Sequence, residues 1–196
     1  MMIFDGHADL LYDVTKWRQA GEDRVLERRH LPRLQAGQIG GLGLSIWTTV
    51  EQDSIWAAHP DWDGWQRTEE MMARAREELA ECPWLAMVRT AAEARKAQAE
   101  GKLFAFLSVE GMEPVSDRLE RLEQYAQWGV RMGMLTWNEE NLLACGAGGD
   151  PDKGLTALGR EAVRRMQRLN ILPDVSHTSD RSFWDIMDLA EGPVIA

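Results

Sequence analysis

The feature that most constrains the fold is an alternation, along the whole chain, of short apolar runs with longer stretches of helical periodicity. The apolar runs cover residues 1–4, 39–47, 103–109, 130–137, 171–176 and 193–196. Near-continuous apolar runs of this length are typical of parallel strands that are covered on both faces. The alternation predicts an α/β fold with a parallel sheet, and it leaves open whether that sheet is a closed barrel or an open doubly wound one.

Apolar residues spaced three and four apart predict the helices between these runs. The clearest stripe extends from Leu155 to Leu169, and others cover residues 71–79, 119–126 and 180–192. In the last of these we expect Met187 to face inward and Gly192 to form the C-cap. Residues 91–102, rich in Ala, Glu and Lys, predict an exposed helix.

The length of 196 residues suits one domain, and we expect residues 1–196 to form a single one. The run at 193–196 looks like the start of a buried strand, with nothing after Ala196 to complete it. An apolar strand left open at its edge is a poor place to end. We therefore expect the N-terminal part of a longer barrel, truncated at about its sixth strand.

Charge and composition narrow the classes of partner. A net charge of −10 disfavours nucleic acid and anionic membranes, which attract Lys and Arg. The sequence contains neither an apolar run long enough to span a bilayer nor the pattern of a signal peptide, so we expect a cytoplasmic protein. Cys82 and Cys145 lie far apart and predict free thiols. The glycine-rich stretch 37–43 enters a strand instead of opening a helix, which favours close packing over phosphate binding.

Polar residues gather where the predicted strands end. His7 and Asp9 follow the first strand, Glu110 ends the third run and His177 follows the fifth. The carboxyl ends of parallel strands meet on one rim, where α/β folds carry their chemistry. Each residue alone has an ordinary structural explanation, such as a loop cap or a satisfied histidine. Together they predict a site for Zn²⁺ or a similar divalent ion, which would also neutralise carboxylates that otherwise repel each other.

Two further assignments accompany this prediction. Residues two apart in an extended segment project to the same side, so His7 and Asp9 would act as a pair. Asp5 is expected to contact one of these metal ligands and to orient it, without binding the ion itself. His30 and His59 lie in polar, loop-like surroundings and are interpreted as surface or pocket-wall histidines.

The sequence resembles the membrane (renal-type) dipeptidases, metallopeptidase family M19, of the metal-dependent hydrolase barrels, and looks most like a soluble bacterial-type member. The resemblance runs along essentially the whole chain. It rests on DGHADL, HLPRLQAGQIGGLGLSIW, SVEGME, LTWNEEN and the long stretch from Gly154 to Ala196. It implies a (β/α)8 TIM-like barrel of which this chain holds about the first six strands.

The resemblance also implies roles for individual residues. His7 and Asp9 would bind one zinc ion, Glu110 would bridge two, and His177 would bind the second. The remaining catalytic residues are expected beyond Ala196, so the chain alone is expected to be inactive. Many members have His in the LTHN motif where this chain has Trp137, and Trp137 and Asn138 are the expected substrate-binding residues. Trp offers an N–H donor and a flat apolar wall, but it has no titratable group.

The function implied by the resemblance is dipeptide hydrolysis by a binuclear zinc site with a metal-bound hydroxide as nucleophile, although other divalent metals would also suit the ligands. Its partner would be a small dipeptide, and a homodimer is compatible with it. Two alternatives stay open: an amide or lactam hydrolase on the same barrel, and a noncatalytic barrel fragment or binding subunit. The HxD spacing of His7 and Asp9, in place of the HxH usual among amidohydrolases, favours the dipeptidase.

Overall fold

The computed structural model describes residues 2–48 and 55–196, which pack as two compact units divided after Ser108. Helices alternate with strands through both units. The pairings of β1 with β2, β3 with β4 and β5 with β6 are all parallel. This confirms the α/β class and the parallel sheet. That residues 1–196 form a single domain stays a prediction.

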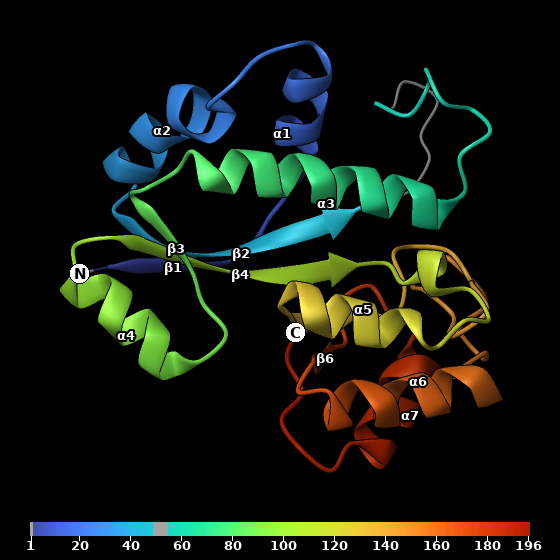
Figure 1. Ribbon diagram of the computed structural model, residues 1–196. Helices are drawn as coiled ribbons and strands as arrows, with labels where there is room; N and C mark the ends of the chain where they lie inside the picture. Colours follow the sequence, from blue (N-terminus) through green and yellow to red (C-terminus); the bar gives the residue numbers. More distant parts are fainter. Residues whose placement is uncertain (1, 49–54) are drawn as a thin grey trace. The chain divides into compact units, whose positions relative to one another are not determined.

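Among its described residues, the first unit contains three complete strands and most of a fourth, which can be followed in Figure 1. The strands are β1 (Ile3–Ala8), β2 (Ile39–Trp47), β3 (Leu85–Met87) and β4 (Leu103–Glu110), which continues into the second unit. Their order is β1-β2-β4, with β3 paired to β4. The helices are α1 (Leu10–Gln19), a π-helix (Leu26–His30), α2 (Leu31–Ala36), α3 (Gly64–Ala80) and α4 (Ala91–Ala99). Helices α1, α2 and α3 contact β2, and α1 also packs on α3.

The glycines of β2 permit close packing within this unit. A Cβ at Gly41 would lie 2.2 Å from the Phe104 ring, and one at Gly43 would lie 2.1 Å from the Gly6 carbonyl oxygen. Phe104 in turn stacks on Phe4, with 5.9 Å between ring centroids. The stretch at 37–43 therefore has the packing role that its sequence context indicates.

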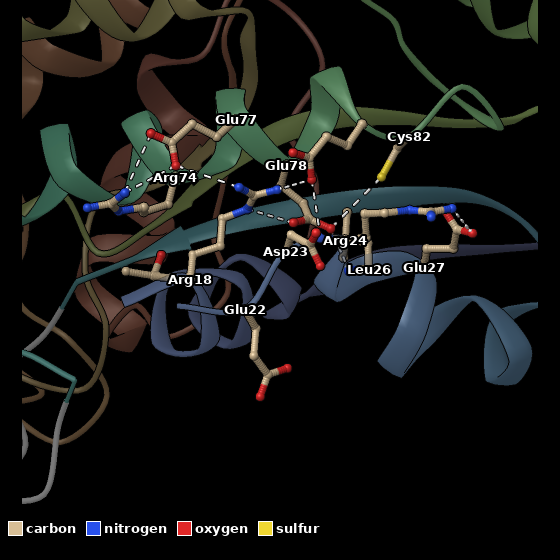
Figure 2. Close-up of polar contacts among 12 residues, drawn as sticks. Arg18, Glu22, Asp23, Arg24, Leu26, Glu27, Arg74, Glu77, Glu78 and Cys82 are labelled. Carbon is tan, nitrogen blue, oxygen red and sulfur yellow. Dashed lines mark hydrogen bonds and ion pairs between the residues drawn. The ribbon is translucent and has the colours of Figure 1, made fainter. Parts of the chain in front are cut away.

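A buried ion pair joins α1 to α3 and to the π-helix (Figure 2). The Glu78 carboxylate is fully buried and accepts hydrogen bonds from Arg18 Nε and from the Leu26 backbone N–H, each at 2.7 Å. Arg18 also contacts Glu81 and, at 3.7 Å, Glu77. The Glu78 carboxylate thus accepts hydrogen bonds from a backbone N–H and a guanidinium, to which the surrounding apolar side chains offer no acceptor.

The second unit contains two complete strands and three α-helices among its residues. These are α5 (Arg121–Trp128), β5 (Val130–Met134), α6 (Ala157–Arg168), β6 (Leu172–Asp174) and α7 (Asp180–Leu189), and a 3₁₀ turn (Glu113–Val115) precedes them. Thr156 and Ser179 cap α6 and α7 with their hydroxyls, and Gly129 ends α5 in the left-handed conformation. Such caps satisfy backbone groups at helix ends and fix where each loop begins.

Several expected boundaries differ from the observed ones. The first strand begins at Ile3 and continues to Ala8, so His7 belongs to it; Met1 lies outside the described residues. Residues 193–196 do not form a regular strand, although Ile195 bridges to Asp174 in parallel fashion. Met187 is 42% exposed and the cap of α7 is Ala190, so both expectations for that helix end are wrong.

Candidate metal centre

The end of β1 brings His7 and Asp9 together. His7 Nε2 lies 3.4 Å from Asp9 Oδ1. The expected pairing is therefore present, but an extended backbone is not its cause: Asp9 occupies the N-cap position of α1, with φ −79° and ψ 31°. The register of β1 against β2 also shifts between Asp5 and Ala8, and such a bulge re-aims the side chains that follow it.

Asp5 supports this bend through the backbone. Its Oδ1 accepts a hydrogen bond from the His7 N–H at 3.2 Å. The contact fixes the main chain of His7 and leaves the imidazole nitrogens to other partners. Asp5 thus holds the His7 backbone, and its role in supporting a metal ligand stays a prediction.

The second unit brings Glu110 and His177 together. Glu110 is the last residue of β4, and its side chain is only 8% exposed. Its Oε1 lies 3.1 Å from His177 Nε2. His177 follows β6 in a left-handed conformation, with φ +64°, that is uncommon for any residue other than glycine. Strained backbone of this kind persists only where surrounding contacts over-determine it.

Residues that follow β5 supply those contacts. The His177 carbonyl accepts hydrogen bonds from the Ala147 N–H at 2.8 Å and from Thr136 Oγ1 at 3.2 Å. His177 Nδ1 lies 3.1 Å from Asn138 Oδ1. The Trp137 ring is tilted against the imidazole, with centroids 6.5 Å apart. Both residues expected to bind substrate, Trp137 and Asn138, are therefore neighbours of His177.

Sequence reasoning missed Glu113, a half-buried carboxylate three residues after Glu110. Glu113 accepts a hydrogen bond from Asn141 Nδ2 at 3.3 Å. Burial raises the pKa of Glu113, although hydrogen bonds from its own N–H, Asn141 and the Trp137 N–H oppose the shift. Gly111, with φ +75°, leaves space for this carboxylate, because a Cβ there would lie 2.4 Å from Glu113 Oε2. An acid two residues after the glycine of SVEGME was the available signal.

The two other histidines have separate partners within the first unit. His30 ends the π-helix with its Nε2 3.2 Å from Asp13 Oδ2, and its side chain is 12% exposed. Burial lowers the pKa of His30, although Asp13 opposes the shift. His59 stacks on Trp62 at 3.8 Å between centroids. His30 is therefore a helix residue facing α1, which corrects its interpretation as part of a loop.

Comparison with known proteins agrees on one family. The sequence model described as membrane dipeptidase (peptidase family M19) matches residues 1–196. An uncharacterized dipeptidase of Schizosaccharomyces pombe is 42% identical over 99 residues, which are 48% of this chain and 24% of that protein.

Two solved structures each match the whole chain with a TM-score of 0.85 at 24% identity. One is the dipeptidase AC, a metallopeptidase of family M19, of which the chain covers 63%. The other is a metallopeptidase from Rhodobacter sphaeroides liganded with a phosphinate mimic of the dipeptide L-Ala-D-Ala, of which it covers 64%. The likeness shows the fold, a partial TIM-like barrel, and decides against an open doubly wound sheet. The chain spans less than two thirds of either structure. Within the described residues, no helix is long and apolar enough to cross a membrane.

Proposed function

Because the chain belongs to peptidase family M19, the membrane dipeptidase family, we propose that its protein hydrolyses dipeptides at a binuclear zinc site built on the two residue pairs described above. The observation that carries the proposal is the contact of Glu110 with His177 at the ends of two strands, 3.1 Å between carboxylate oxygen and imidazole nitrogen. A relative whose structure holds a dipeptide mimic supports a dipeptide as substrate.

The donor atoms of the chain suit divalent zinc. His7 with Asp9, and Glu110 with His177, each present one imidazole nitrogen beside one carboxylate oxygen. Nitrogen and oxygen donors of this kind are ordinary zinc ligands, and a carboxylate can bridge two ions with its two oxygens. We assign His7 and Asp9 to one ion, His177 to the other and Glu110 to both.

When bound, a pair of such ions makes water nucleophilic at neutral pH and polarises the substrate carbonyl. The residues of the chain do the rest. Glu110 ends a regular strand and is nearly buried, so its carboxylate is held in place and little exposed to competing water. Trp137 offers a flat apolar wall beside His177, against which a substrate side chain can pack.

Two properties of the whole protein belong to the same proposal. Both cysteines are buried free thiols, which supports a reducing compartment such as the cytoplasm. The proposal is also compatible with a homodimer.

The test measures metal content and turnover in the full-length protein. We expect close to two zinc ions per chain and hydrolysis across a panel of L,L and L,D dipeptides. His7→Ala and Glu110→Ala should each lower the metal content, and Glu110→Ala should abolish turnover because it removes the bridge. His59→Ala is the matched control, since the His59 ring stacks on Trp62 and is not one of the assigned ligands, so its loss should leave the metal content unchanged.

Two results would contradict the proposal. Metal-replete protein that cleaves no dipeptide in the panel would refute the activity. Full metal content in both His7→Ala and Glu110→Ala would refute the ligand assignment. The panel should include a lactam and a simple amide, because cleavage of those alone would identify a different hydrolase.

A further inference from the structure

Asn138 is held in place by the glycine-rich segment that follows it. The Gly148 N–H donates to the Asn138 carbonyl at 2.8 Å. A Cβ at Gly146 would lie 2.5 Å from the carbonyl oxygens of both Trp137 and Asn138, so the segment passes closer to the Asn138 main chain than any side chain would allow. The backbone of Asn138 is thereby held in the position from which its side chain reaches His177.

The direction of its hydrogen bond follows from chemistry. An amide oxygen only accepts hydrogen bonds, so the contact of Asn138 Oδ1 with His177 Nδ1 places the proton on Nδ1. In the neutral ring that a metal ligand requires, the lone pair is then on Nε2, the nitrogen that lies 3.1 Å from Glu110 Oε1. The same imidazole belongs to a residue whose strained backbone is held by Thr136 and Ala147.

We propose that Asn138 is a positioning residue that fixes the tautomer and orientation of the His177 ring for metal binding through Nε2, and that it does not bind the substrate. This inference rests on the proposed function, because it assumes that His177 is a metal ligand. A partner on the second ring nitrogen of a metal-binding histidine raises its basicity and prevents its rotation. The glycine-rich segment 146–149 then serves the metal centre indirectly, by fixing the residue that orients the ligand.

The experiment measures the zinc affinity of the full-length protein by competition with a chelating dye. Asn138→Leu keeps the approximate size and removes the acceptor, so we expect the weaker zinc site to lose about 10- to 100-fold in affinity. Asn138→Asp keeps an acceptor oxygen and should bind at least as tightly as wild type. Thr178→Val is the matched control, because it removes a hydrogen bond to the Val175 carbonyl beside His177 and leaves the ring contacts intact.

Kinetics separate a positioning role from substrate binding. In Asn138→Leu we expect kcat to fall at limiting zinc, to recover with excess zinc, and KM to stay near wild type. A raised KM with unchanged zinc affinity would instead identify Asn138 as a substrate ligand and overturn the inference.

The remaining outcomes are also decisive. If Asn138→Leu fails to fold, Asn138→Asp still tests the proposal, since binding weaker than wild type would overturn it. Wild-type protein that binds no zinc would refute the proposed function. Wild-type protein that binds zinc no better than Asn138→Leu would refute only the role of Asn138.

Discussion

Replacing Glu78 by Gln tests how much the buried ion pair between α1 and α3 stabilises the first unit. Glu78 uses both carboxylate oxygens, one for Arg18 Nε and one for the Leu26 N–H, each at 2.7 Å. Gln has the same shape but only one acceptor oxygen. Its NH₂ group must therefore face either the guanidinium or the backbone N–H, and one buried donor loses its partner.

The magnitude follows from the contacts that remain. A buried donor left unsatisfied costs about 1–3 kcal/mol, and more where a charged group is involved. Breaking a buried ion pair by removing one partner costs about 3–5 kcal/mol when the other charge is stranded. Arg18 is not stranded, because it still contacts Glu81 and Glu77. We therefore expect Glu78→Gln to lower the free energy of unfolding by about 2–3 kcal/mol, between these cases.

The assay is urea denaturation followed by tryptophan fluorescence. Glu77→Gln is the matched control: Glu77 is the preceding residue of the same helix, but it is 49% exposed and lies 3.7 Å from Arg18. Exposed ion pairs contribute little, so this variant should lose less than about 0.5 kcal/mol. Equal losses in the two variants, or a Glu78→Gln protein as stable as wild type, would refute the reasoning.

Two further predictions concern titrating groups. Burial opposes ionisation of Asp185, but hydrogen bonds from the Leu155 N–H and Arg160 outweigh it and lower the pKa of Asp185 below its ordinary value of 3.8. The ionised Asp185 carboxylate therefore stabilises the protein above pH 3.8, and this contribution is lost as the pH falls through the lower native pKa. We expect Asp185→Asn to lower the free energy of unfolding by about 1–3 kcal/mol at pH 7, and urea titrations at acidic pH should show a smaller loss. A loss that grows with acidification would contradict this. Burial raises the pKa of the Cys82 thiol to about 12. Because iodoacetamide reacts with the thiolate, it should label Cys82 at pH 8 at least about 100-fold more slowly in native protein than in urea. Equal labelling rates would contradict this.

Apolar patterning was enough to predict the long strands and helices. Strands β2 and β4 lie close to the predicted runs because continuous burial leaves a continuous apolar sequence. Strand β3 was missed, although its three residues lie within the apolar run 83–88. Met187 shows the opposite failure: it has the spacing of the apolar stripe, yet within the described part of the chain it is 42% exposed.

The candidate site residues could be proposed from where strands end, while their geometry could not. His7, Glu110 and His177 follow from the rule that parallel strands present polar residues at one rim. The left-handed backbone of His177 depends on donors from Thr136 and Ala147, which are 41 and 30 residues away in sequence. Periodicity carries no information about such contacts, so the second partner of the imidazole, Asn138, could only be found in three dimensions.

The glycines of β2 connect packing to the site more directly than their sequence context suggested. The Gly6 carbonyl oxygen packs so closely against Gly43 that a Cβ on residue 43 would lie only 2.1 Å from it. Gly6 immediately precedes His7. At this point the register of β1 shifts, and Asp5 bonds back to the His7 N–H. A side chain at position 43 would push against the bulge itself, because a backbone carbonyl cannot rotate away as a flexible side chain can. The stretch that reads as simple close packing therefore also determines the direction in which the first proposed metal ligand points.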